Sequence, residues 1–318
     1  MAKTLLEYSD WLAERKLRWP APPKIDPITA TPSIKPLENI RAVTWSLYGT
    51  LLRITDGELI FEHPQSIRME VAIDKTIHEF NMWNSMTRRP GKPSDSLLPK
   101  YLNALHDSLL TSGNRKGDLP EVDAAYVWRT LIGLLNKKEY VYDESLYGDA
   151  VALSEKIAYF FHCSLQGTEA APAALTTLTA VAAGGLRQAA LANAQCFTLV
   201  QLTRALREQG SLVDVETLLP ASLNTLSHEW GIRKPSISLY AQSILRFKEI
   251  GIEPDQILHV GTRIQDDLAV AKICGFRTVL YAADKTSLQA TSSELRNPET
   301  RPDRLITDLA QLRDILQL

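Results

Sequence analysis

The feature that most constrains the fold is a regular alternation of short apolar segments and longer amphipathic segments after residue 168. The expected strands are 187–192, 256–260, 277–281 and 304–306, and the expected helices are 171–183, 197–209, 236–249, 267–274 and 308–316. Strand–helix alternation with short connections predicts a parallel α/β sheet covered by helices on both faces. Right-handed crossovers then bring the carboxyl ends of the strands, and any functional site, to one edge of the sheet.

One more strand is expected much earlier in the chain, at 40–45 (IRAVTW), where a β-branched apolar run is broken by Gly49-Thr50. Between it and the later strands lies a helical block, with helices expected at 64–86, 99–110, 121–135 and 145–165 and with Pro99 in a first helical turn. Because this block is inserted between strands of one sheet, we expect it to cover the functional edge as a cap. The predicted division is an arm at 1–38, an α/β core at 39–56 and 168–318, and an all-helical cap insertion at 57–167.

The N-terminal arm combines an amphipathic helix, expected at 3–18, with a proline-rich stretch at 20–36. Proline has no backbone N–H and a fixed φ, so the second part should be extended. Two interpretations remain open. The arm either packs on the surface of its own domain, or it docks a protein partner or a second copy of the chain in a homo-oligomer.

Charge and cysteine content exclude several classes of protein. The formal net charge is −2 and the pI is about 6.3, so no long-range attraction to nucleic acid or to anionic membranes is expected. The three cysteines are scattered without C-x-x-C spacing, which argues against a disulfide framework or a structural zinc site. No apolar run has the length of a membrane span or the form of a signal peptide, so a cytoplasmic location is expected.

Three short segments lie at the expected strand ends. They are SLYGTL at 46–51, SHEWGIRKP at 227–235, and VGTRIQDD at 260–267 followed by AK and CG at 271–275. The order and residue pattern of these segments resemble the motifs of the haloacid dehalogenase (HAD)-like hydrolase superfamily. Those motifs are D-x-[DY]-G-T-L, G-x-x-K-P, and V-G-D-x-x-x-x-D followed by A-x-x-A-G. The resemblance covers residues 39–318. It implies a Rossmann-like α/β hydrolase fold with a helical cap.

The resemblance also implies roles for individual positions. Catalytic positions map to Ser46, Tyr48, Lys234 and Asp267. Anion-binding positions map to Thr50, Ala192, Asn193 and Lys234, and metal-binding positions map to Thr262, Asp266 and Asp267. Family members use Mg²⁺ at the last group, so Mg²⁺ is implied as a cofactor.

Several of these positions depart from the family pattern. The nucleophilic Asp is replaced by Ser46, whose hydroxyl is protonated at neutral pH and needs a base. Ala192 has no donor where the family has a hydroxyl, and Thr262 replaces the first acid of the metal-binding loop. Magnesium sites often depend on only one or two protein carboxylates, so we expect weak Mg²⁺ binding or none.

The sequence leaves several alternatives open. Asp266 and Asp267 precede an expected helix and would equally serve as helix caps. A serine–lysine dyad of Ser46 and Lys234 would require a neutral lysine, buried away from Asp267. The leading hypothesis is a catalytically degenerate hydrolase, a pseudoenzyme retained for binding a small anion or for a structural role. The alternatives are an active hydrolase of small organic phosphates or halides that uses Ser46 or an activated water, and an assembly interface formed by arm and cap.

Overall fold

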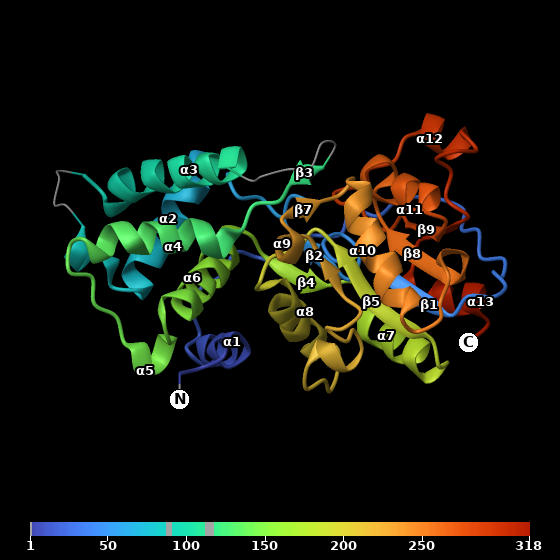
Figure 1. Cartoon of the computed structure of the whole chain (residues 1–318), viewed down its shortest axis with the longest axis horizontal. Helices are drawn as coiled ribbons and strands as arrows, with labels where there is room; N and C mark the ends of the chain where they lie inside the picture. Colours follow the sequence, from blue (N-terminus) through green and yellow to red (C-terminus); the bar gives the residue numbers. More distant parts are fainter. Residues whose placement is uncertain (1, 87–90, 112–117) are drawn as a thin grey trace.

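A single parallel sheet organises the α/β part of the chain (Figure 1). Its strands are β1 (Ala42–Trp45), β5 (Arg187–Ala192), β6 (Thr225–Leu226), β8 (Ile257–Gly261), β9 (Arg277–Tyr281) and β10 (Arg304–Ile306). In the computed structural model, which describes residues 2–86, 91–111 and 118–318, these six strands pair in the order β10-β9-β8-β1-β5-β6, all in parallel. The predicted parallel α/β sheet is confirmed, and β1 lies at its centre between β5 and β8.

Helices cover both faces of this sheet because successive strand residues point to opposite sides. The helices are α7 (Ala174–Ala183), α8 (Thr198–Arg207), α10 (Ile237–Lys248), α11 (Ala269–Ile273) and α13 (Leu312–Leu316). Val43 and Trp45 of β1 belong to an apolar cluster with α7, α8 and α13. Ala42 belongs to a second cluster with α10 and α11 on the other face. The remaining short helices of this part are α9 (Ser227–Trp230) and α12 (Ser292–Arg296).

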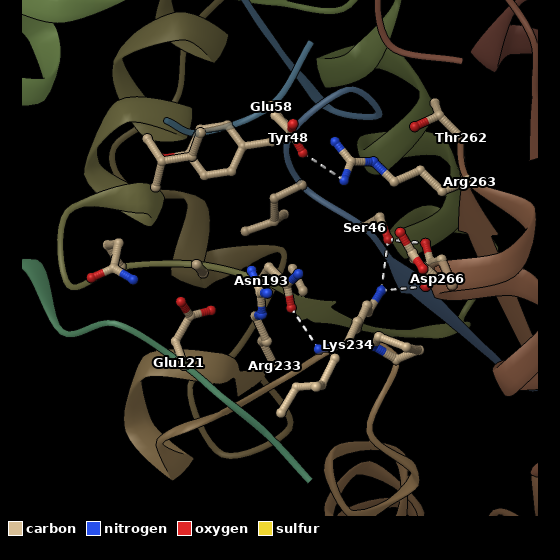
Figure 2. A pocket seen from close by; sticks show the side chains of 18 of the residues that line it. Ser46, Tyr48, Glu58, Glu121, Asn193, Arg233, Lys234, Thr262, Arg263 and Asp266 are labelled. Atoms are coloured by element: carbon tan, nitrogen blue, oxygen red, sulfur yellow. Dashed lines mark hydrogen bonds and ion pairs between the residues drawn. The ribbon is translucent and has the colours of Figure 1, made fainter. Parts of the chain in front are cut away.

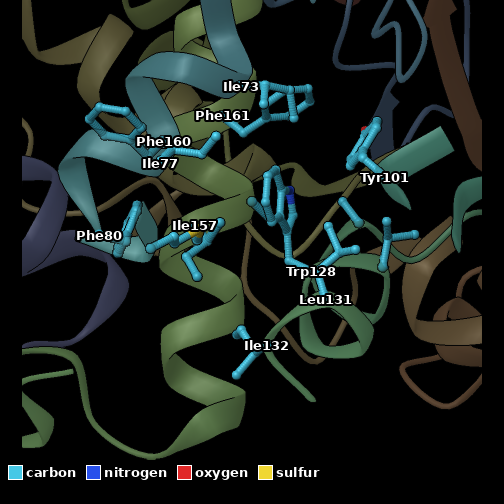
Figure 3. Close-up of a cluster of buried hydrophobic side chains, with 14 of the residues drawn as sticks. Ile73, Ile77, Phe80, Tyr101, Trp128, Leu131, Ile132, Ile157, Phe160 and Phe161 are labelled. Carbon is cyan, nitrogen blue, oxygen red and sulfur yellow. The ribbon is translucent and has the colours of Figure 1, made fainter. Parts of the chain in front are cut away.

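A layer of helices is inserted after β1 and has its own apolar centre. It comprises α2 (Ser66–Glu79), α3 (Pro93–Thr111), α4 (Ala124–Asn136), α5 (Glu144–Tyr147) and α6 (Ala150–Leu165). We call these five helices the helical layer. Trp128 of α4 is fully buried, with its ring centroid 5.4 Å from that of Tyr101 and 5.3 Å from that of Phe161 (Figure 3).

Two details of the helical layer differ from the prediction. Pro99 lies inside α3, because that helix begins at Pro93 and its buried face continues past Pro99 through Tyr101. The helix expected at 145–165 is divided in two. Gly148 has a φ of +82°, which ends α5, and the Asp149 side chain then caps the first turn of α6.

Short antiparallel pairs attach the helical layer to the sheet. β2 (Leu52–Ile54) pairs with β4 (Thr168–Ala170), so the chain leaves and re-enters the α/β part at neighbouring points. A second antiparallel pair joins β3 (Leu119–Pro120), which lies between α3 and α4, to β7 (Ile232–Arg233). Strands of two or three residues are too short to show a sequence period, and none of these four was predicted.

The N-terminal arm packs against its own chain. α1 (Leu5–Glu14) begins with a capping box between Thr4 and Glu7, and its Tyr8 and Leu12 are buried in the apolar cluster of the helical layer. The extended segment that follows runs along the α/β part, where the Leu37 N–H donates to the Ile315 carbonyl at 2.9 Å. A role of the arm in assembly stays a prediction.

None of the helices in the described ranges combines the length and apolarity needed to cross a membrane. Cys163, Cys196 and Cys274 all carry free thiols.

Candidate functional site

Three neighbouring strands end at the same edge of the sheet and bring the sequence motifs together (Figure 2). Ser46 follows β1 directly, Asn193 follows β5, and Thr262 follows β8. The register is fixed by backbone bonds, since the Ser46 N–H donates to the Val260 carbonyl at 2.9 Å. These motifs, far apart in the chain, therefore line one cleft of about 280 Å³, as the resemblance implies.

A closed polar network fills the floor of this cleft. The Ser46 hydroxyl donates to Oδ2 of Asp267 at 2.5 Å and accepts from Nζ of Lys234 at 2.8 Å. Lys234 also forms an ion pair with Oδ1 of Asp267, and both side chains are about 95% buried. Lys234 therefore has an anionic partner in Asp267, although position 46 carries no charge.

His259, Tyr240 and Thr44 complete the network, and sequence reasoning assigned none of them to it. The Tyr240 hydroxyl donates to Oδ1 of Asp267 at 2.9 Å. Nε2 of His259 lies 2.7 Å from the same oxygen, and Nδ1 lies 2.8 Å from the Thr44 hydroxyl. Burial lowers the pKa of His259, whereas the Asp267 carboxylate acts in the opposite direction. We assign Nε2–H as the donor to Asp267.

The backbone around Asp267 explains why its carboxylate points inward. Residues Ile264–Leu268 form a π-helical turn, in which the Leu268 N–H donates to the Arg263 carbonyl. The carboxylate then lies over Gly261, where a Cβ atom would overlap Oδ2. Asp267 bonds to side chains of the network, so the interpretation of Asp267 as a helix cap is wrong.

Opposing effects act on the ionisable groups of the network. Burial raises the pKa of Asp267, but the charges and hydrogen bonds of His259 and Lys234 outweigh it and hold that pKa well below its ordinary value. Burial lowers the pKa of Lys234, and the Asp267 carboxylate counteracts this. A serine–lysine dyad requires Lys234 away from Asp267, whereas the structure joins the two in an ion pair. That condition is not met.

The structure brings some of the other predicted positions to the cleft and leaves Thr50 outside its lining. Tyr48 lines the cleft, but its hydroxyl donates to Gln201 at 2.7 Å and contacts Thr198 at 3.1 Å, away from Ser46. Ala192 and Asn193 line the cleft at the end of β5, as do Thr262 and the exposed Asp266 near β8. Thr50 is fully buried and lies outside the cleft lining. The structure therefore does not bring Thr50 to the site.

Further charged groups line the cleft, and the motifs gave no signal for them. Arg263 forms an ion pair with Glu58 at 3.0 Å, close to where the chain enters the helical layer. Glu121 follows β3 and its carboxylate accepts a hydrogen bond from the Ser227 hydroxyl at 2.5 Å. Burial raises the pKa of Glu121, while the Ser227 bond acts in the opposite direction. Glu121 belongs to the sequence of the helical layer and reaches the cleft only through the β3–β7 pairing.

The residues at the metal positions do not fit a magnesium ion. Mg²⁺ prefers anionic oxygens in a near-octahedral arrangement. Ser46 and Thr262 supply neutral hydroxyls, and both oxygens of Asp267 already accept hydrogen bonds from protein side chains. Of the three metal positions, only the exposed Asp266 keeps a carboxylate outside the network. Among residues 2–86, 91–111 and 118–318, no group of three or more His, Cys, Asp or Glu side chains is arranged to hold a metal.

The Gln195 side chain, which follows β5, holds the segment after β3 through two hydrogen bonds, and its replacement tests the role of these bonds. Its Nε2 donates to the Val122 carbonyl at 2.7 Å, and its Oε1 accepts from the Ala124 N–H at 2.9 Å. Gln195→Leu leaves both buried backbone groups unpaired, at about 1–3 kcal/mol each. We expect faster hydrogen exchange in 119–124, measured by mass spectrometry with the amides of α7 as the internal reference. Unchanged exchange in 119–124 would contradict this role.

Comparisons with known proteins agree with this fold. Residues 231–312 match the HAD-hydrolase-like family. A phospholysine phosphohistidine inorganic pyrophosphate phosphatase from Xenopus laevis is 32% identical over 85 residues, and the match spans 27% of this chain and only 29% of that protein. A 2-haloacid dehalogenase from Pseudomonas syringae pv. tomato has a TM-score of 0.52 at 20% identity, covering 87% of this chain and 97% of that one.

An L-2-haloacid dehalogenase from Xanthobacter autotrophicus aligns over 86% of this chain and 96% of its own, with a TM-score of 0.41 and 20% identity. The matched segment 231–312 contains Lys234 and Asp267 of the polar network. This match and the parallel sheet support a HAD-like hydrolase fold for the chain.

Proposed function

We propose that this chain is a catalytically degenerate member of the HAD-like hydrolase superfamily. It does not carry out Mg²⁺-dependent ester-forming chemistry, and it retains its cleft to bind a small anionic molecule. The observation that carries the proposal is the closed network of Ser46, Lys234 and Asp267. A carboxylate nucleophile would have to be free to attack, and a metal would need free anionic oxygens. Here the Asp267 carboxylate is bound to an ammonium, an imidazole and two hydroxyls, and of the three metal positions only Asp266 keeps a carboxylate outside this network.

An active hydrolase that uses Ser46 is the second candidate. One contact favours it, because the Ser46 hydroxyl donates to the Asp267 carboxylate as a hydroxyl does to a general base. Two features weigh against it. The depressed pKa of Asp267 makes the carboxylate a weak base, and the Lys234 ammonium competes for the same oxygens.

A turnover assay separates the two candidates. We expect p-nitrophenyl phosphate and 2-chloropropionate, each with Mg²⁺, to be hydrolysed no faster by the wild-type protein than by the Lys234→Ala and Ser46→Ala variants. Product release is measured by absorbance for the phosphate ester and by chloride detection for the haloacid. Mg²⁺-dependent turnover that both variants abolish would remove the proposal. Turnover without Mg²⁺ that Ser46→Ala abolishes would favour the serine hydrolase.

A further inference from the structure

The cleft contains a cation that neither the family motifs nor the polar network uses. Arg233 lines the cleft next to Lys234 in the sequence, on the short strand β7. The pairing of Arg233 with Leu119 fixes its backbone. Figure 2 shows Arg233 between Glu121 and Lys234, on the side of the cleft opposite Thr262 and Arg263.

The two other cations of the cleft lining are already neutralised. Lys234 is paired with Asp267, and Arg263 with Glu58. Arg233 is different: in the part of the chain that the structure describes, it belongs to none of the ion pairs, and its side chain is exposed to the cleft. It therefore keeps its full set of guanidinium donors for a ligand.

Asn193 supplies a second donor beside this arginine. Its Oδ1 accepts a hydrogen bond from the Lys234 N–H at 2.8 Å, and this bond orients the amide. Asn193 also lines the cleft, and Figure 2 shows it next to Arg233, so its Nδ2 group is a second donor in this part of the cleft. A guanidinium and an amide N–H₂ in the same part of a cleft are complementary to an oxyanion.

The surrounding carboxylates limit the charge of that oxyanion. Glu121 lies close enough to Arg233 for the arginine to favour its ionised form, and Asp266 is exposed at the cleft. After the two ion pairs cancel, the charged groups of the lining are Arg233 and these two acids. A group with one negative charge is repelled less here than a phosphate ester with two. The planar guanidinium also matches a carboxylate in a two-point contact.

We propose that Arg233 and the Asn193 amide together bind the carboxylate of a small monocarboxylic acid. This inference rests on the proposed function, because it names the anion that the cleft takes. It moves the anion site away from Lys234, where the family motif places it, to the neighbouring residue. The cleft volume of about 280 Å³ limits the ligand to a small molecule.

Isothermal titration calorimetry of the full chain tests the inference. The probes are glycolate, lactate and pyruvate as carboxylates, and inorganic phosphate and glycerol phosphate as phosphates. We expect at least one carboxylate to bind more tightly than either phosphate. Arg233→Gln should weaken that binding by about tenfold or more, and Arg233→Lys should weaken it less. Arg187→Gln is the matched control, since Arg187 lies at the opposite end of β5 and should leave binding unchanged.

Thermal unfolding of each variant checks that the fold is retained. Three outcomes overturn the inference: no carboxylate binds the wild type, Arg233→Gln binds as tightly as the wild type, or phosphate binds more tightly than every carboxylate. The proposed function fails by a different readout, because Mg²⁺-dependent turnover would overturn it even if Arg233 bound the carboxylate as proposed.

Discussion

Replacing Asp267 by asparagine is expected to lower the free energy of unfolding by about 3–5 kcal/mol at pH 7, because it leaves a buried ammonium without its counter-charge. The Lys234 side chain is only 5% exposed, so water compensates poorly for the lost counter-charge. Tyr240 and His259 also lose an anionic acceptor in this variant. Urea unfolding followed by circular dichroism measures the change. The size of the effect follows from the unpaired charge and not from lost packing, since asparagine has nearly the same shape.

Two further variants distinguish this explanation from general damage. Asp266→Asn changes the same chemical group at the exposed neighbouring position and should shift stability by no more than about 0.5 kcal/mol. Removing both charges with Lys234→Met and Asp267→Leu should cost less than Asp267→Asn alone. Equal losses for the single and the double variant would show that the charge pairing is not what matters.

The same ion pair gives stability a pH dependence of known sign. The pKa of Asp267 is depressed in the folded state, so its contribution is present above the unfolded value of about 4. As the pH falls below that value, the unfolded state takes up a proton that the folded state does not, and the contribution is lost. The difference in stability between wild type and Asp267→Asn should therefore shrink as the pH is lowered from 5 towards 2.

Introducing two carboxylates is expected to create a magnesium site in the cleft. Ser46→Asp with Thr262→Asp places acids after the adjacent strands β1 and β8, next to Asp267. The added acids compete with Asp267 for Lys234, which releases anionic oxygen for a metal. At a Mg²⁺ concentration of about 100 times Kd, binding stabilises the folded state by about 2.7 kcal/mol. Thermal unfolding with and without Mg²⁺ measures this, and Ala192→Ser can be added to restore the missing hydroxyl.

The control for this experiment keeps the size of the side chains and removes their charge. Ser46→Asn with Thr262→Asn should show no Mg²⁺-dependent shift in melting temperature. Equal stabilisation of the wild type by Mg²⁺ would contradict this prediction, because it would mean that the neutral hydroxyls of Ser46 and Thr262 suffice to bind the ion. Without Mg²⁺, the double aspartate variant should be less stable than wild type, because three carboxylates then share one lysine.

The sequence predicted the sheet well where apolar runs are isolated by glycine or polar residues. The bounds of β5 and β9 agree with the expected 187–192 and 277–281, because each run is followed or preceded by a clear break such as Gly275. The short pairs that attach the helical layer were missed, since two or three residues show no period. Pro99 misled the placement of α3, because tertiary packing overrode the usual position of proline.

The sequence predicted some members of the candidate site and missed others. The motifs placed Ser46, Lys234 and Thr262 at one edge, and the strand order brings them there. The pairing of Lys234 with Asp267 was not predicted, because Asp267 lies in a π-helical turn that the sequence pattern does not indicate. Glu121 gave no signal at all. Its position depends on a backbone pairing between segments more than a hundred residues apart.

The pairing of β3 with β7 has a consequence for ligand exchange. If the helical layer were connected to the α/β part only through the β2–β4 pair, it could rotate about that pair and widen the cleft. The pairing with β7 is a second backbone connection, at Arg233. Rotation would require breaking its backbone hydrogen bonds. We therefore expect the cleft to widen less during ligand exchange than it would with the β2–β4 connection alone, which favours the entry of small molecules.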